Sequence, residues 1–320
     1  MMIPWRSLLL GLALFVLGPV AWAQSLVETA ARVVIVSSDT TAAYAQASDA
    51  LVDGLVRQGI PRAEIMQSFA PELAKRLASG QLQRTVIFVA LGSAATQVLV
   101  ASNVPVPVLC ALIPRHSFEY ILRSNGRAMS DRLSVVYLDQ PLTRQLALIR
   151  LALPQARRLG VLVGLESFDK ANELKTLVSS YGMELHQAVV TRPDDFPTAL
   201  PQLLDGIDVL LALADPTVFN RGTIQNILLA SFHERIPLVA FSPAYVHAGA
   251  MLAVYSSSQQ AGSQAADVVM GVLRGQALPD RAIEPNDFEV GVNANVARVL
   301  GISPDAQQLR MSLRRQEHLP

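Results

Sequence analysis

Short apolar runs rich in Val, Ile and Leu alternate along this chain with longer segments in which apolar residues recur at helical spacing. The runs lack strict apolar–polar alternation, as expected of strands that are covered on both faces of a parallel sheet. Strands that alternate with helices in this way are typical of β-α-β units. The predicted strands lie at 32–36, 85–91, 106–111, 133–136, 159–163, 185–190, 209–214, 237–241, 251–255 and 288–292.

The segment after the fourth run has the clearest helical stripe. Leu142, Leu146, Ile149 and Leu153 follow one another at spacings that place them on one face of a helix. The final segment, 307–320, is polar and basic and is interpreted as a loosely packed last helix or a frayed end. Further helices are predicted at 44–57, 94–101, 170–181, 221–234, 259–274 and 295–300.

The first residues have the pattern of a secretory signal peptide. Arg6 precedes an apolar run at 8–17, and the triplet Ala21-Trp22-Ala23 predicts cleavage before Gln24. A membrane anchor is the alternative, but an apolar core of about 10 residues falls short of the roughly 20 that span a bilayer. The residue directly after the cleavage site is Gln24 and not a cysteine, so a bacterial lipid anchor is not expected. We therefore expect a soluble periplasmic protein.

Cleavage would leave 297 of the 320 residues, a length at which one hydrophobic core usually gives way to two. The sequence therefore predicts an α/β protein with two Rossmann-like lobes. Lys+Arg and Asp+Glu both number 26, so no charge excess favours binding to nucleic acid or to an anionic membrane. Cys110 is the single cysteine and lies in an apolar run, where a small buried side chain is expected.

Polar and small residues follow many of the predicted strands. In open parallel sheets, ligands bind beyond the carboxyl ends of the strands, so two such sheets facing each other would form a cleft. We expect a small-molecule site built from six turns. Its candidate ligand-binding residues are Ser38 and Asp39; Gly92, Ser93, Ala94 and Ala95; Arg115; Glu166 and Ser167; Asp215 and Thr217; and Ser242 and Tyr245.

Several of these residues suggest recognition chemistry. The Gly92 turn could hold an anionic group at the start of a helix, although such a glycine is also ordinary between a strand and a helix. Asp215 could pair with a ligand ammonium, but Asp before Pro is also a common turn residue. Tyr245 and Phe219 could stack on an apolar ligand body or simply pack in the core. Arg115 could bind an anion or lie solvated in its loop.

A search for catalytic chemistry finds no constellation. The five histidines are scattered, without a pair at metal-ligand spacing. The sequence contains no G-x-S-x-G elbow, no Walker loop and no G-x-G-x-x-G turn. We therefore predict no enzyme activity, no metal and no cofactor, and a hydrolase or transferase on the same scaffold is disfavoured.

The run from Ala214-Asp215-Pro216-Thr217 through Phe219-Asn220-Arg221 to Ile236-Pro237-Leu238 resembles the ABC transporter substrate-binding family related to tryptophan/tyrosine uptake proteins. Phe241-Ser242-Pro243-Ala244-Tyr245 and Tyr255-Ser256 resemble it too, and the likeness covers nearly the whole mature chain. It implies a type I periplasmic-binding-protein fold, with two lobes joined by three crossings and a solute in the hinge cleft. By position, the resemblance implies that Asp215, Thr217, Asn220, Ser242 and Tyr245 line the second lobe's wall of that cleft. It would assign 24–138 with 247–282 to lobe 1, and 139–246 with 283–320 to lobe 2.

The chain departs from the family pattern in the first lobe. Family members usually have a His-Pro element after the first strand and a Thr-Asp-Pro element after the third. This chain has Asp39-Thr40-Thr41-Ala42 and Ile113-Pro114-Arg115-His116 at those places. The resemblance therefore indicates a small polar or amino-acid-like solute but leaves its identity open.

The expected mechanism is closure of the two lobes on the solute, because the closed state gains contacts that the open state lacks. The resemblance implies a monomer that delivers its solute to an ABC permease. A sensor that reports the solute to a membrane receptor is the alternative. Bacterial repressors share these lobes, but a signal peptide and the lack of a basic headpiece argue against DNA binding.

Overall fold

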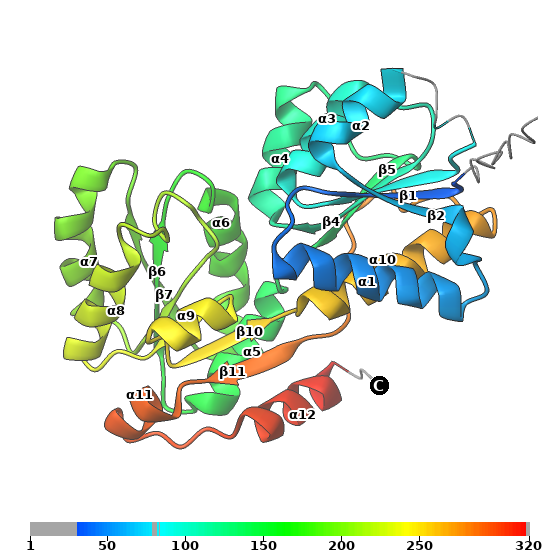
Figure 1. Cartoon of the computed structure of the whole chain (residues 1–320). Helices are drawn as coiled ribbons and strands as arrows, with labels where there is room; N and C mark the ends of the chain where they lie inside the picture. The colour runs from blue at the N-terminus through cyan, green and yellow to red at the C-terminus, as the bar shows by residue number, and fades with distance from the viewer. Residues whose placement is uncertain (1–30, 79–81, 83, 318–320) are drawn as a thin grey trace, which may run out of the picture.

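The computed structural model describes residues 31–78, 82 and 84–317, so the predicted signal peptide lies outside the described residues. Within these residues the chain forms two α/β lobes, with the first lobe and the second lobe side by side in Figure 1. Both sheets are flanked by helices, which confirms the predicted fold class. No helix in the described part of the chain combines the length and the apolar character needed to cross a bilayer.

The first lobe is built on a sheet in which all pairings are parallel, with the strand order β2-β1-β3-β4-β5. Helix α10 comes from late in the sequence and lies along α1 on one face of this sheet. The strands are β1 (Val33–Ser37), β2 (Ile65–Phe69), β3 (Ile87–Leu91), β4 (Val108–Ile113) and β5 (Leu133–Tyr137). The helices are α1 (Ala42–Arg57), α2 (Ala70–Ala78), α3 (Ser93–Ser102), α4 (Arg115–Ser124) and α10 (Ser258–Leu273).

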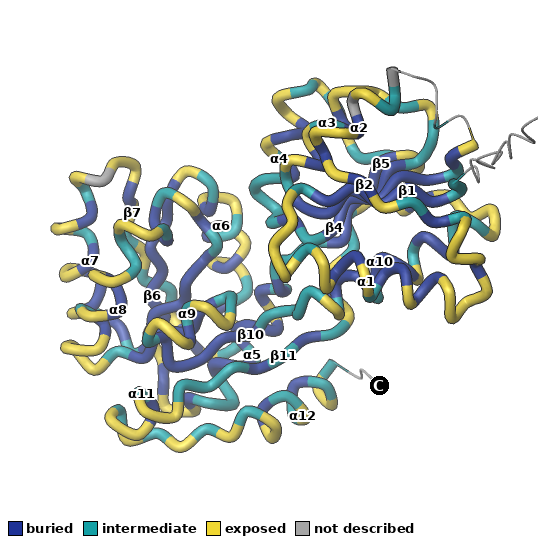
Figure 2. Tube along the Cα trace, viewed as in Figure 1, coloured by how far each residue is buried: buried dark blue, intermediate teal, exposed yellow. Residues whose placement is uncertain are grey.

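The central strands of this lobe are apolar on both faces because both faces are covered. Val33 and Ile35 belong to the core cluster that includes residues of α1 and α10. Val34 and Val36 belong to the cluster that includes residues of α2, α3 and α4. Alternate side chains of one strand thus enter two different cores, which explains the continuous apolar run. Figure 2 shows the strands as the most buried part of the lobe.

The second lobe has the strand order β11-β10-β9-β8-β6-β7, parallel except for β11 at one edge. The predicted parallel arrangement therefore needs correction at this last strand. The strands are β6 (Arg158–Val163), β7 (Glu184–Val189), β8 (Val209–Leu211), β9 (Leu238–Ala240), β10 (Leu252–Tyr255) and β11 (Glu289–Val292). The helices are α5 (Leu142–Ala152), α6 (Phe168–Leu177), α7 (Phe196–Leu204), α8 (Ile224–His233), α9 (Pro243–Ala248), α11 (Ala294–Val299) and α12 (Ala306–Gln316).

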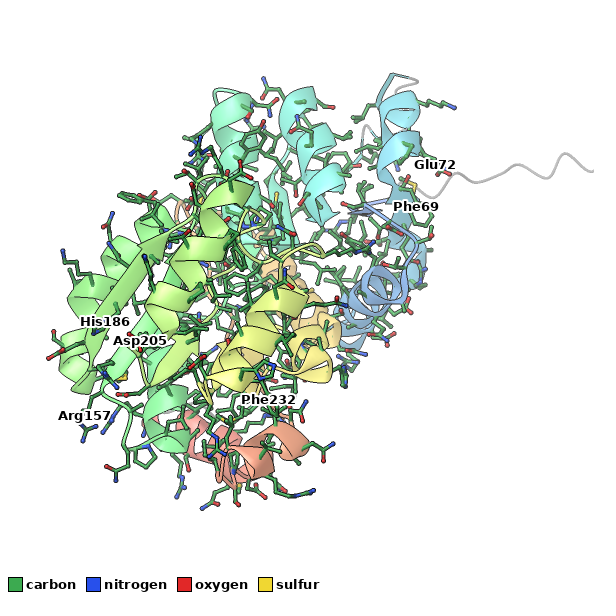
Figure 3. The ribbon with its side chains drawn as sticks, turned by 90° about the vertical axis from the view of Figure 1, so that its left-hand side faces the viewer. Phe69, Glu72, Arg157, His186, Asp205 and Phe232 are labelled. Atoms are coloured by element: carbon green, nitrogen blue, oxygen red, sulfur yellow. The ribbon has the colours of Figure 1, made fainter. Side chains whose placement is uncertain are left out.

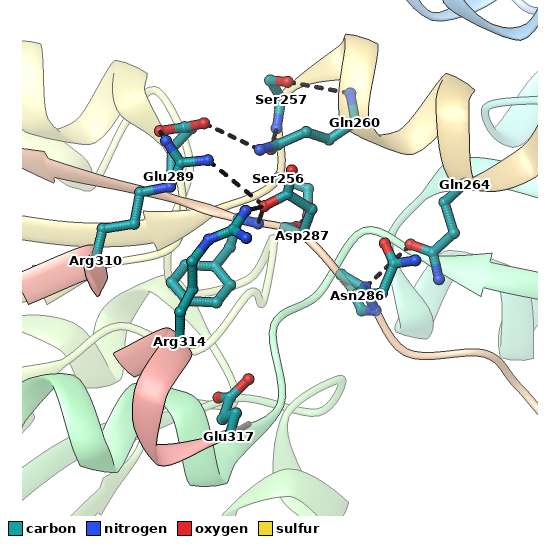
Figure 4. A network of polar contacts seen from close by, with 12 residues as sticks. Ser256, Ser257, Gln260, Gln264, Asn286, Asp287, Glu289, Arg310, Arg314 and Glu317 are labelled. Atoms are coloured by element: carbon teal, nitrogen blue, oxygen red, sulfur yellow. Dashed lines mark hydrogen bonds and ion pairs between the residues drawn. The ribbon is translucent and has the colours of Figure 1, made fainter. Parts of the chain in front are cut away.

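The chain passes between the lobes three times, at 138–141, 256–257 and 284–288. The second and third crossings are joined where the Ser256 hydroxyl donates to the Asp287 carbonyl at 2.7 Å. Figure 4 shows the C-terminal helix α12 reaching this joint. Arg310 pairs with Glu289 at 2.9 Å, and Arg314 pairs with Asp287. Of the two alternatives for this segment, the structure shows the last helix, which runs through Gln316 and is tied to the third crossing.

The buried guanidinium of Arg144 also connects segments of this region. It donates to Gln140 Oε1 at 2.6 Å and to the Pro285 carbonyl at 3.0 Å, and it pairs with Glu317 at 2.6 Å. The Cζ atom of Arg144 lies 4.3 Å from the centre of the Phe288 ring. One side chain therefore holds together the first crossing, the third crossing and the end of the chain that the structure describes.

All ten predicted strands are present, but β2 was missed. Its sequence Ile65-Met66-Gln67-Ser68-Phe69 interrupts the apolar pattern with polar residues because it is an edge strand. The lobe assignment also needs a correction: β10 pairs with β9 and β11, so the first residues of the predicted lobe 1 segment 247–282 belong to the second sheet. Helices α2, α4, α7 and α9 were likewise not predicted.

Candidate functional site

The turns that follow the strands of the two sheets face each other across a crevice between the lobes. Its outer part is a cavity of ≈ 480 Å³ lined by Ser93 and Ala94 at the start of α3, by the first turns of α4, and by Glu166 and Pro216 of the second lobe. Its inner part is a cavity of ≈ 150 Å³ beside the first crossing. The expectation that strand-end turns of both lobes line one shared crevice agrees with this geometry.

The inner cavity combines an apolar wall with a small group of polar side chains. Leu138 and Pro114 face it from the first lobe, and Leu213 and Phe241 from the second. Its polar lining consists of Asp139, Gln140, Gln145, Lys170 and Ser242. A mostly apolar pocket with a few convergent polar groups is the usual form of a small-molecule site.

Gln145 is a polar residue of the inner cavity wall, and one of its side-chain atoms has no hydrogen-bond partner among the described residues. It lies on α5 and is 5% exposed. Its Nε2 donates to the Gln140 carbonyl at 2.9 Å, whereas its Oε1 is buried and has no partner among the described residues. A buried acceptor without a partner costs free energy unless something supplies a donor. Because the atom is itself buried, it lies within the wall of the cavity and not on its surface.

A residue that lines the outer cavity has a second buried polar atom without a hydrogen-bond partner among the described residues. His116, at the start of α4, has a buried Nδ1 without a partner in the described part of the chain, while its Nε2 lies 3.0 Å from Ser117 Oγ. The other described histidines lie elsewhere: Figure 3 shows His186 near Arg157 and Asp205 on the outer side of the second lobe. Within the described residues, no group of histidine, cysteine and acidic side chains could hold a metal ion.

Several of the predicted site residues line the crevice. Ser93, Ala94 and Glu166 line the outer cavity, and Ser242 lines the inner one. Arg115 lies next to Pro114 at the crevice but is engaged with carboxylates, Glu119 at 2.7 Å and Glu173 of the second lobe at 3.5 Å. Burial opposes the charge of Arg115, yet the bond and charge of Glu119 outweigh it and raise its pKa.

The predicted residues of the first two strand ends hold their own turn together instead. The Ser38 hydroxyl donates to the Leu91 carbonyl at 2.8 Å and accepts from the Ala95 N–H at 2.9 Å. Gly92 has φ +85°, and a Cβ there would come within 2.5 Å of the Tyr44 hydroxyl. Asp39 accepts from the Thr41 N–H at 2.9 Å. This turn joins β1 to α3 and needs glycine for its conformation and for space.

Asp215 also has a different role from the one predicted. It is 2% exposed, and its carboxylate accepts from Ser167 Oγ at 2.8 Å, Glu166 N at 3.1 Å and Thr217 N at 2.8 Å. With its donors supplied by its own lobe, the carboxylate is not available to a ligand ammonium. Asp215 and the fully buried Ser167 therefore fix the two turns of the second lobe.

The remaining predictions on the second lobe follow the same pattern. The Asn220 amide donates to the Pro216 carbonyl at 2.9 Å and accepts from the Gly222 N–H at 2.8 Å. The Tyr245 hydroxyl donates to the Phe219 carbonyl at 3.2 Å, and its ring packs 4.9 Å from that of Phe241. Asn220, Tyr245 and Thr217 line neither of the two cavities. Asn220 therefore stabilises its own turn, and Tyr245 packs against neighbouring aromatic residues.

The sequence reasoning missed Asp139, Lys170 and Gln145. Asp139 follows the fifth strand of the first sheet and Lys170 lies in the first turn of the helix after β6, so the strand-end rule could have found both. Gln145 carries no such signal, because it lies within a helix stripe. Cys110 is buried as predicted, and burial raises the pKa of its thiol to about 12.

We expect the change Asp215→Asn to lower the free energy of unfolding by about 1 kcal/mol, because the amide cannot accept at both of its ends and at least one buried N–H loses its acceptor. Urea unfolding of both proteins would measure the loss. Asn220→Asp, in a more exposed turn, serves as a comparison in which the charge changes in the opposite direction. An Asp215→Asn protein as stable as the wild type would contradict this role.

The family model described as ABC transporter substrate binding protein matches residues 31–309. Among curated proteins, no sequence matches this chain significantly. A ligand-free, open substrate-binding protein with adhesive properties from Clostridium difficile superposes with a TM-score of 0.70 at 17% identity, covering 86% of this chain and 96% of its own.

Two further structures have the same fold. A conserved domain protein from Vibrio cholerae gives a TM-score of 0.60 at 20% identity, covering 88% of this chain and 98% of its own. An ABC domain in complex with L-Trp from Streptococcus pneumonia gives 0.60 at 16% identity, with coverage of 88% and 98%. At these identities the likeness shows the fold.

Proposed function

Because this chain belongs to the ABC transporter substrate-binding protein family, we propose that it is an extracytoplasmic protein that captures a small polar or amino-acid-like solute between its lobes and delivers it to an ABC permease. One structural neighbour is a substrate-binding protein, and another was solved in complex with L-Trp. The proposal includes the predicted signal peptide and a monomeric binding protein.

The observation that carries the proposal is the inner cavity between the lobes, an apolar pocket whose wall includes the polar residues Asp139, Gln140, Gln145, Lys170 and Ser242. A solute held there would contact α5 of the second lobe and, across ≈ 150 Å³, the Leu138 side of the first lobe. Such a solute would stabilise the closed arrangement, because only the closed arrangement offers both walls.

A thermal-shift screen of residues 24–320 against amino acids, small acids, polyols and sugars tests the binding step. A ligand that binds only the native state raises the melting temperature. We expect one solute class to do so and Gln145→Leu to weaken the shift, because the change replaces a polar group of the cavity wall with an apolar side chain of similar size. Gln155→Leu, at a position outside the inner cavity, is the control and should leave the shift unchanged.

Uptake measurements test the delivery step. We expect the purified protein to stimulate uptake of the solute by membranes that contain its permease. Binding of a solute without any stimulated uptake would contradict transport and would favour the receptor-linked sensor considered above. A screen in which no solute shifts the wild-type protein would contradict the binding proposal itself.

A further inference from the structure

The inner cavity contains a cation that belongs to the protein. Lys170, in the first turn of α6 of the second lobe, pairs with Asp139 at the first crossing. The two side chains are only 12% and 8% exposed. The other oxygen of Asp139 accepts from the backbone N–H of Arg115 at 2.7 Å. Both oxygens of this carboxylate are therefore satisfied from within the protein.

The pair is part of the cavity wall and not a surface bridge. Asp139 and Lys170 both line the inner cavity, next to Gln145 and Ser242. A carboxylate in such a place is costly unless a positive charge accompanies it. In a cleft without an internal cation, a ligand ammonium could provide that charge. Here Lys170 already provides it.

A ligand ammonium would have to displace Lys170 to reach Asp139. The lysine is attached to the protein and loses no translational freedom on pairing, whereas a free solute does. The displaced lysine would also have to leave a mostly buried position. Competition at this carboxylate therefore favours the lysine over a soluble amine.

A second ion pair between the lobes is weaker by the same reasoning. Arg115 lies 3.5 Å from Glu173, but these side chains are 35% and 49% exposed. Exposed pairs of this kind contribute little, because water screens them. Lys170 and Asp139 are the charged contact between the lobes that lies inside the cavity.

We propose that Lys170 permanently occupies the cation position of this cleft, so that the cleft selects an uncharged solute and rejects solutes with a free primary ammonium. This inference rests on the proposed solute-binding function and narrows its solute class. The Asp139 carboxylate in the cavity wall is already neutralised by Lys170, and the other polar side chains of the wall, Gln140, Gln145 and Ser242, carry no charge.

Chemical rescue with n-butylammonium tests the assignment without knowledge of the natural solute. The variant Lys170→Ala leaves a hole of the shape of this amine beside Asp139. We expect the variant to melt at least about 3 °C below the wild type. Millimolar n-butylammonium should restore part of that loss, and n-butanol, which has the same length without the charge, should not.

The wild type and the variant Lys175→Ala are the controls. Lys175 is exposed on the same helix, so its removal opens no buried position. Neither protein should respond to n-butylammonium. An equal shift in the wild type would show that the cation position is open and would overturn the proposal. A folded Lys170→Ala protein that n-butylammonium does not stabilise would overturn it as well.

A double-mutant cycle covers the case in which Lys170→Ala does not fold. Lys170→Met and Asp139→Asn should each lower the melting temperature, and the loss from Asp139→Asn should be smaller when Lys170 is already methionine. Strictly additive losses would overturn the pairing. These tests need no solute, so a failed solute screen contradicts the proposed function alone. A wild-type protein that binds an amino acid more tightly than its deaminated counterpart would overturn this proposal and leave the proposed solute-binding function standing.

Discussion

Replacing Arg144 with methionine is expected to lower the free energy of unfolding by about 4 kcal/mol. Removing one partner of a buried charged pair typically costs about 3–5 kcal/mol. Arg144 has only 5% of its side chain exposed, and its loss would leave Gln140 Oε1 and the Pro285 carbonyl without their donor. The stacking on Phe288 would be lost too, although methionine keeps part of the apolar contact.

Arg150→Met on the same helix is the matched control. Arg150 donates to the Pro154 and Ala156 carbonyls at 3.1 Å near the end of α5, where water can replace it. We expect a loss below about 1 kcal/mol for this change, as is usual for exposed polar contacts. Urea unfolding of the three proteins would compare them. Equal losses would show that Arg144 is not the tie between the crossings.

A functional consequence accompanies the Arg144 change. The guanidinium joins two of the three crossings and Glu317, so its removal frees the segments that bend when the lobes move. We expect small-angle scattering of Arg144→Met to show a larger or more varied separation of the lobes than in Arg150→Met. An unchanged scattering curve would separate the stability role from the hinge role.

The substitution Gly262→Ala is expected to lower the free energy of unfolding by about 2 kcal/mol or more. Alanine favours a helix over glycine by about 1 kcal/mol. At this position, however, the added Cβ would lie 2.1 Å from the Ala47 carbonyl oxygen, which is backbone of α1. Helices α1 and α10 would have to separate, and overpacking of a core costs typically about 1–3 kcal/mol and occasionally more. The steric cost therefore exceeds the helix gain.

Gly271→Ala supplies the comparison within the same helix α10. Its Cβ would meet only the end of the Gln276 side chain, at 2.6 Å, and that side chain can rotate away. Here the helix gain should win, so we expect a stability equal to the wild type or up to about 1 kcal/mol higher. Thermal unfolding of both variants measures the difference. A Gly262→Ala protein as stable as Gly271→Ala would show that the two helices can move apart freely.

The central strands of both sheets were predicted correctly because a strand buried on both faces needs a continuous apolar run, and that run is visible in the sequence. The edge strand β2 was missed because an edge strand has no such need: Gln67 and Ser68 interrupt it. Helix α4 was missed for a different reason, because its buried residues Phe118, Ile121 and Leu122 form a stripe too short to identify.

The amino-acid sequence by itself determined the two α/β lobes, their strands and the polar turns at the strand ends, because burial and backbone preference act through neighbouring residues. The tertiary structure alone decided which turn residues face the crevice. Asp215 and Ser38 were predicted to contact a ligand, yet each is engaged in hydrogen bonds to segments at least 48 residues away. The pairing of Lys170 with Asp139 across 31 residues is likewise set by packing of the lobes. Partners so distant in sequence leave no local pattern, which is why the charge of the cavity could be assigned only from the fold.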